Sequence, residues 1–300
     1  MSIHAQGQIL AAPPGLLASR ATRSFASKVL FYLLAVVLGL LFVAPFLFAI
    51  STSLKEPAEI YRFPPQWLPS HILWQNYAET WTLVPFWRWV LNSGLVTAVT
   101  MAGQICSATV VAYGFARFDF KGRGVLFVIL LGTMIVPSEV TIIPQFLLFK
   151  GLGWLNTYLP LIVPSYFGGG AFTIFLLRQF FLTLPRDLDD AAEIDGASTL
   201  RVLVEILVPL SKPALATIAI FAFVGSWNDF FGPLIYLNTE DLFTVALGLY
   251  FFKSLPTDSG PVLVQFLMAA AIMMTLPVIV VFFSLQRYFM QGIVMSGIKG

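Results

Sequence analysis

A cluster of carboxylates between residues 184 and 210 is the part of the chain best placed to do chemistry. It holds six of the fifteen acidic residues: Asp187, Asp189, Asp190, Glu193, Asp195 and Glu205. No arrangement for nucleophilic catalysis is visible in the chain, because no serine has a histidine partner within an apolar run. Carboxylates at the start of a helix face its positive amino-terminal end, and the cluster therefore predicts a capped helix in contact with water.

The segment Leu184–Leu210 is expected to form two helices joined by a glycine turn. Pro185 ends the apolar run before it, and Gly196 accepts the left-handed turn that ends the first helix. Four residues at i, i+3, i+4 and i+7 share one face of that helix: Leu188, Ala191, Ala192 and Asp195. The small alanines let another surface approach closely. The second helix is expected from Ser198 to Val208, before Pro209.

Isolated polar residues inside apolar runs are candidates for a path across a membrane. Asn92 and Gln104 are the largest polar residues in one such run, and Glu139 follows a proline in another. Trp227, Asn228 and Asp229 interrupt a third run, where an indole, an amide and a carboxylate suit a carbohydrate. Polar side chains in a membrane either join helices by hydrogen bonds or line an aqueous path, so structural roles stay open for all six.

The composition makes the bilayer the solvent of this chain. Of the 300 residues, 58% are hydrophobic and 11% are charged, against about 25% charged in soluble domains. The net charge of +2 is too small to indicate nucleic-acid binding. One cysteine and two histidines argue against a Cys/His metal site, and no catalytic residues or bound cofactor are predicted.

Six apolar runs are long enough to be transmembrane helices, which predicts an all-α membrane protein. They are Val29–Ile50, Trp89–Tyr113, Val125–Phe146, Leu159–Phe181, Leu203–Leu237 and Val262–Tyr288. The first has 22 residues without a charge and spans a hydrocarbon core of about 30 Å, so it is not expected to be a cleaved signal peptide. The prolines at 137 and 144 indicate a broken or ending helix around Glu139.

The distribution of Lys and Arg predicts the orientation in the membrane. Twelve of the 17 lie on the side of the amino terminus and of Leu184–Leu210, and five lie on the opposite side. Both termini and this segment are therefore expected to be cytoplasmic. Three parts are predicted. Residues 1–28 form an irregular cytoplasmic tail, residues 29–290 form a six-helix membrane domain, and residues 291–300 form a second cytoplasmic tail.

Four segments, taken in order, resemble the permease subunits of bacterial ATP-binding-cassette (ABC) importers. Asp190, Ala191 and Ala192, with Gly196 after three intervening residues, resemble the family's cytoplasmic EAA loop, although Asp190 replaces a glutamate. The other segments are NTYLPLIVP, WNDFFGPLIYL and the terminal GIVMSGIKG. Together they are similar to the carbohydrate-uptake, maltose-type branch, and specifically to the shorter of its two permeases, with the MetI-like six-helix architecture.

The resemblance implies a set of functional residues and partners. The EAA loop is the coupling helix that docks on a separate ATPase, which here implies contacts from Leu188, Asp190, Ala191, Ala192, Asp195, Gly196 and Ala197. The terminal residues Ser296, Gly297 and Lys299 are implied to contact the same ATPase. The implied assembly has a second homologous permease, two ATPase copies that bind ATP and Mg, and an extracytoplasmic substrate-binding protein. It lies in the lipid of the bacterial inner membrane.

The expected function is ATP-driven import of a sugar or oligosaccharide by alternating access. The chain has no GxxxxGK[ST] phosphate loop, so ATP hydrolysis is assigned to the separate ATPase. A permease for another solute, such as glycerol phosphate, is the nearest alternative, although few Lys or Arg lie in the spans. An ion-coupled secondary transporter would need paired intramembrane ionisable residues, and a membrane enzyme would need clustered His, Asp or Glu.

Overall fold

The computed structural model describes residues 14–252 and 263–297, and this part of the chain contains helices and no strand. The first half contains α1 (Pro14–Ser53), α2 (Pro57–Ile60), α3 (Gln75–Leu83), α4 (Phe86–Arg117), α5 (Arg123–Gly132), η1 (Thr133–Ile135) and α6 (Ser138–Gly151). The middle contains α7 (Leu159–Ile162), η2 (Val163–Tyr166), α8 (Ala171–Thr183), α9 (Asp187–Ile194), α10 (Thr199–Arg201), η3 (Val202–Leu207) and α11 (Val208–Leu210). The last part contains α12 (Lys212–Trp227), α13 (Phe231–Tyr236), η4 (Glu240–Leu242), α14 (Val245–Phe252) and α15 (Val264–Gly297).

The described helices agree with a six-span membrane protein. Four are long and apolar enough to cross a membrane, and two bent pairs raise the number to six if each pair is one span. The first bent pair, α5 with η1 and α6, turns by 98°. The broken helix predicted around Glu139 is confirmed, since α5 has only ten residues and Pro137 precedes the start of α6. Proline disfavours helical backbone in the residue before it, which accounts for the break.

The second bent pair lies where the segment Leu184–Leu210 joins the fifth span. The helical stretch Thr199–Leu210 meets α12 at an angle of 81°, with Ser211 between them. The prediction of one run over Leu203–Leu237 is therefore wrong in detail, because Lys212–Trp227 forms a separate helix. At the other end of the chain, α1 begins at Pro14, so part of the segment predicted as an irregular tail is helical.

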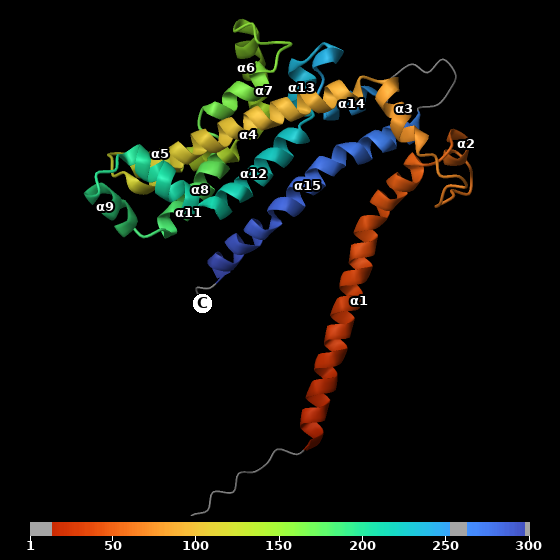
Figure 1. The fold of residues 1–300 in the computed structure, drawn as a ribbon, viewed down its shortest axis with the longest axis horizontal. Coiled ribbons are helices and arrows are strands. Elements are labelled where there is room, and N and C mark those ends of the chain that lie inside the picture. Colours follow the sequence, from red (N-terminus) through yellow and green to blue (C-terminus); the bar gives the residue numbers. More distant parts are fainter. Residues whose placement is uncertain (1–13, 253–262, 298–300) are drawn as a thin grey trace, which may run out of the picture.

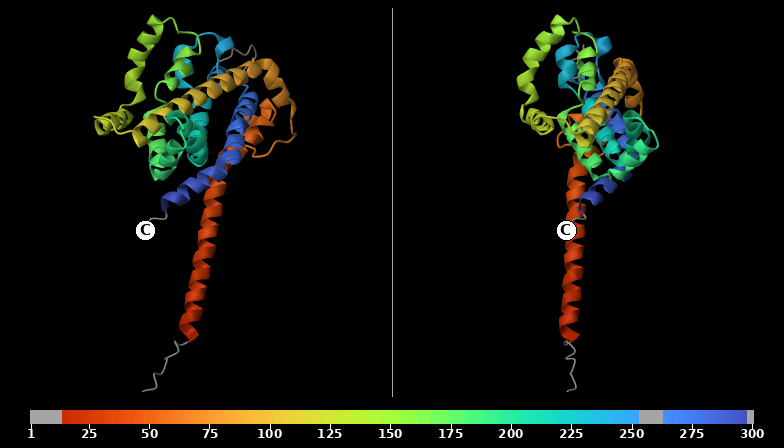
Figure 2. Two further views of the ribbon diagram at one scale, coloured as in Figure 1. Left: turned by 60° about the vertical axis from the view of Figure 1, so that its left-hand side comes forward. Right: turned by 90° about the vertical axis from the view of Figure 1, so that its left-hand side faces the viewer.

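Helix α4 lies at the centre of the body. It packs along α8 and α12, and α12 in turn packs along α15. Figures 1 and 2 show α1 extending away from these helices, with only its carboxyl-terminal end close to the body, where it contacts α15. The described part of the span in α1 has no buried residue within its most apolar window, as expected for a helix that faces lipid.

Two hydrophobic clusters stabilise opposite ends of the body. One joins the carboxyl-terminal half of α4 to α8, α9 and η3, with Ala112, Leu177 and Leu207 fully buried. The other joins the start of α4 to α12, α14 and α15, with Phe86 and Trp89 at its centre. In this second cluster α14 packs closely on α4 at Gly248, because a Cβ at this position would lie 2.3 Å from the Trp89 ring. α4 therefore connects the two ends mechanically.

Candidate functional site

The segment 184–210 has the helix, turn and helix that its sequence predicts. α9 runs from Asp187 to Ile194, and Gly196 then takes a φ of +79°. The turn is closed by two backbone hydrogen bonds, from Gly196 N to Glu193 O at 3.0 Å and from Ala197 N to Ala192 O at 2.9 Å. The second helical stretch contains six π-helical residues, Val202–Leu207, and extends past Pro209 to Leu210.

The two alanines of α9 differ in exposure. Ala192 is 7% exposed and belongs to the hydrophobic cluster beneath α9, so it offers another subunit little surface, and its docking role stays a prediction. Ala191 is exposed and Ile194 is 86% exposed, while Leu188 lies at the edge of the same side. Successive residues are about 100° apart around a helix, so neighbouring alanines point in different directions. We refer to Leu188, Ala191 and Ile194 as the outer face of α9.

The other predicted contact residues of this segment remain accessible. Asp190, Asp195 and Gly196 are exposed, and Ala197 is half-buried against the hydrophobic cluster. Of the tail residues, Ser296 and Gly297 lie in the last turn of α15, while Lys299 lies outside the described residues. The docking roles of all these residues stay predictions.

An ion pair that the sequence did not reveal fixes α9 to the end of α4. Arg117 Nη2 lies 3.1 Å from Asp189 Oδ2, and the two side chains are only 7% and 15% exposed. Arg117 Nη2 also donates a hydrogen bond to the Leu184 carbonyl at 3.1 Å. Tyr113, one turn earlier on α4, donates its hydroxyl to the Thr199 carbonyl at 3.3 Å. The segments before and after the glycine turn are thus both bonded to α4.

Two further arginines stabilise the same end of the molecule. Arg178 on α8 donates from Nε to the Phe115 carbonyl at 3.2 Å, and its guanidinium lies 4.1 Å from the centre of the Phe127 ring. Arg201 pairs with Glu205 at 2.8 Å on the exposed surface, and this hydrogen bond raises the pKa of Arg201 above its ordinary value.

A cavity of about 420 Å³ lies between α4, α8 and α12, deeper in the body. Its polar lining consists of Thr100, Gln104, Thr173, Ser226, Asp229 and Thr244. Gln104 Nε2 donates to Thr173 Oγ1 at 2.9 Å across the cavity wall, and the Thr244 hydroxyl is buried without a hydrogen-bond partner in the described part of the chain. Among the residues that the structure describes, no Lys, Arg or His lines the cavity. Such a cavity presents hydroxyl, amide and carboxylate groups to a solute.

The fold places two of the polar residues that interrupt apolar runs, Gln104 and Asp229, in this cavity. The Asp229 carboxylate accepts a hydrogen bond from Gly232 N at 3.1 Å, so it also closes the turn into α13.

The predicted pathway residues Trp227, Asn228 and Glu139 lie outside this cavity. Trp227 is 4% exposed, donates from Nε1 to the Met274 carbonyl at 3.0 Å and stacks on Phe223. Asn228 is exposed and donates to the Val224 carbonyl, and Glu139 is exposed in the first turn of α6. None of these three lines the cavity.

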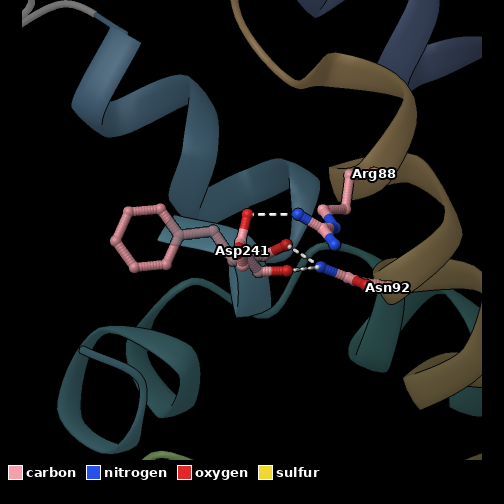
Figure 3. A network of polar contacts seen from close by, with 4 residues as sticks. Arg88, Asn92 and Asp241 are labelled. Carbon is pink, nitrogen blue, oxygen red and sulfur yellow. Dashed lines mark hydrogen bonds and ion pairs between the residues drawn. The ribbon is translucent and has the colours of Figure 1, made fainter. Parts of the chain in front are cut away.

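Asn92 holds an irregular segment against α4 instead of lining the cavity. Its amide donates 2.9 Å hydrogen bonds to the carbonyls of Asp241 and Phe243, and Arg88 pairs with the Asp241 carboxylate one turn away (Figure 3). Asn92 therefore joins two parts of the chain by hydrogen bonds, which was the structural alternative for this residue.

Comparisons with known proteins place the chain in a transport family. Residues 104–294 match the family described as binding-protein-dependent transport system inner membrane component. The arabinooligosaccharides transport system permease protein AraQ of Bacillus subtilis (strain 168) is 33% identical over 267 residues, which cover 88% of this chain and 93% of AraQ. The sn-glycerol-3-phosphate transport system permease protein UgpE of Yersinia pestis bv. Antiqua (strain Antiqua) is 30% identical over 271 residues, covering 88% and 95% of the two chains.

A solved structure supports the same assignment. A bacterial ABC transporter involved in the import of the acidic polysaccharide alginate contains a chain that matches with a TM-score of 0.80 and 25% identity, over 90% of this chain and 98% of that chain. The matched family region contains the segment 184–210, Asp229 and most of α15. The chain therefore belongs to the family of binding-protein-dependent transport system inner membrane components, and it is a membrane permease subunit of an ABC transporter, not an enzyme.

Proposed function

We propose that this permease carries a neutral sugar or oligosaccharide into the cell by ATP-driven alternating access. The relative AraQ is named for arabinooligosaccharides, which supports a carbohydrate. The cavity between α4, α8 and α12 supports a neutral one, because its described lining residues include a carboxylate, Asp229, and no cationic side chain. In a low-dielectric site this carboxylate attracts hydroxyl donors and repels anions.

The transport cycle requires partners that bind nucleotide and deliver solute. We propose a second homologous permease, two ATPase copies that hold ATP and Mg, and an extracytoplasmic substrate-binding protein. The accessible outer face of α9, with the exposed Asp190 and Asp195, is the proposed docking surface for the ATPase. Ser296, Gly297 and Lys299 are the proposed second contact. The excess of Lys and Arg around this segment supports a cytoplasmic location for it and for both termini.

Helix α4 is the proposed mechanical link between ATP and the cavity. It carries Arg117, which holds α9, and Gln104, which lines the cavity thirteen positions earlier, about 20 Å along the helix. A helix held at both ends by packed contacts transmits a rigid-body displacement that an irregular connection would absorb. Movement of the docked α9 therefore shifts one wall of the cavity relative to α12.

Glycerol phosphate is the second candidate substrate, because UgpE carries that name. It is disfavoured by the lining of the cavity, since a phosphate would require a cationic partner there or from the second permease.

Uptake by the reconstituted complex tests the proposed substrate class. Proteoliposomes that contain this chain with its partner permease, ATPase and binding protein are expected to accumulate a labelled arabinooligosaccharide when ATP is supplied. An excess of unlabelled neutral oligosaccharide should compete, whereas glycerol phosphate and an acidic oligosaccharide should not. ATP-dependent uptake of an anion without uptake of any neutral sugar would contradict the proposal.

The variant Asp229→Asn tests whether the cavity carboxylate contacts the solute. Asparagine keeps the oxygen that accepts the Gly232 N–H but removes the charge. A hydrogen bond to a charged group contributes about 1.5–3 kcal/mol, so saturable uptake of the neutral sugar should fall about tenfold or more at low sugar concentration. Asn228→Ala is the matched control, because Asn228 is exposed outside the cavity lining. Unchanged uptake by Asp229→Asn would exclude a direct contact.

A further inference from the structure

Large apolar side chains are exposed along the connection between α1 and α3. We call residues 61–74 the aromatic loop. Its exposed members are Tyr61, Phe63, Trp67, Leu68, Ile72 and Trp74, of which Phe63 is 91% and Leu68 78% exposed. The stretch from Phe63 to Pro69 carries no charge. A soluble surface rarely exposes such a continuous apolar patch, so a partner of low polarity is indicated.

The aromatic loop turns back along the end of the first membrane span. The span Ser27–Ser53 has a mean hydropathy of 2.9. Trp67 packs edge-to-face on Phe48 with ring centres 5.7 Å apart, and its carbonyl accepts a hydrogen bond from the Ser51 hydroxyl. Phe48 lies five residues before Ser53, about 7 Å along the helix. In Figure 1 the loop lies beside the carboxyl-terminal end of α1. The loop therefore reaches the level of the apolar span.

The backbone of the aromatic loop is suited to a region with little water. Three of its residues, Pro64, Pro65 and Pro69, have no N–H to satisfy. The Gln66 carbonyl accepts from the ammonium group of Lys55, a side chain that is 2% exposed and lies under the loop. Another bond, from Leu73 N to Leu54 O at 3.0 Å, fixes the end of the loop to the span. Irregular backbone near lipid is tolerated when its polar groups are paired in this way.

We propose that the aromatic loop is an interfacial anchor that lies in the headgroup region of the bilayer, at the end of α1 opposite to the α9 side of the protein. Trp and Tyr prefer this region because their rings are apolar and their polar atoms reach water. The Phe48 contact makes the loop continuous with a surface that faces lipid. The anchor fixes the depth and tilt of α1, whose contact with the body is confined to its carboxyl-terminal end, against α15.

Spin-label depth measurements test the proposal on the assembled transporter. The single cysteine is removed as Cys106→Ser, and a nitroxide is attached at Phe63→Cys or Leu68→Cys, both highly exposed positions. Glu56→Cys is the matched control, because Glu56 is exposed at the start of α2 and outside the aromatic loop. The complex is placed in lipid nanodiscs, and the accessibility of each label to oxygen and to a water-soluble nickel chelate is compared.

The two loop labels should show a several-fold higher ratio of oxygen to nickel accessibility than the control, which identifies the lipid interface. Nickel accessibility equal to that of the Glu56→Cys label would overturn the proposal, since the loop would then lie in water. Low accessibility to both reagents would also overturn it, because a protein partner such as the second permease would then cover the loop. Labelling should leave the amount of assembled complex unchanged, since neither side chain is buried.

Discussion

Replacing Ile194 with aspartate is expected to prevent the ATPase from remaining bound to the purified permease. Ile194 is the more exposed of the two large apolar residues of α9, and 86% of its surface is accessible. An apolar side chain at the centre of a docking surface typically contributes at least about 2 kcal/mol, which is a factor of about 30 in affinity. The variant also adds a carboxylate to the four on α9, and in a closed interface it would have to be buried.

The experiment is co-purification through a tag on this chain, followed by quantification of both subunits. Ile194→Asp should leave the amount of permease in the membrane unchanged, because the side chain makes no core contact. Ile194→Leu is the matched control and should retain the ATPase. A cysteine at position 194 should crosslink to the ATPase, whereas one at the buried position 192 should not. Normal retention of the ATPase by Ile194→Asp would contradict docking at the outer face of α9.

Loss of the Arg117–Asp189 ion pair should be the most damaging change inside this chain. Arg117→Met leaves the Asp189 carboxylate, 15% exposed, without its cation. Removing one partner of a buried pair costs about 3–5 kcal/mol because the remaining charge is desolvated without compensation. We expect a lower midpoint of thermal unfolding for the complex and loss of ATP-coupled uptake, since α9 is no longer held to α4.

A double-mutant cycle separates this ion pair from general damage. Asp189→Leu alone should be nearly as harmful as Arg117→Met, because it leaves the arginine buried without its carboxylate. The combined Arg117→Met, Asp189→Leu variant removes both charges and should recover much of the thermal stability. Thermal shifts that simply add in the double variant would contradict a direct interaction between the two side chains.

The general architecture of this protein can be predicted from its sequence. Long apolar runs such as Val29–Ile50 must be helical and must span, because the bilayer offers the backbone no hydrogen-bond partners and fixes the length. The hairpin around α9 is equally local, since acidic residues begin the helix and Gly196 ends it with a positive φ. These features depend on neighbours within a few residues along the chain.

The contacts of individual side chains could not be predicted from the sequence, because their partners lie far away along the chain. Ala192 is buried because α4, α8 and η3 lie beneath it, and Asn92 is engaged by a segment 149 positions away. The same is true of Trp227, which donates to Met274, and of Asp229, which the packing of α4 and α12 places in the cavity with Gln104. Hydropathy indicates whether a segment is buried or faces lipid, and residue spacing indicates which side chains share a helix face. Neither specifies which helix packs on which face. The packing of helix faces depends on the complete folded chain. The sequence by itself therefore determined the spans and the hairpin around α9. Only the tertiary structure decided which face of α9 is free and which polar groups meet at the cavity.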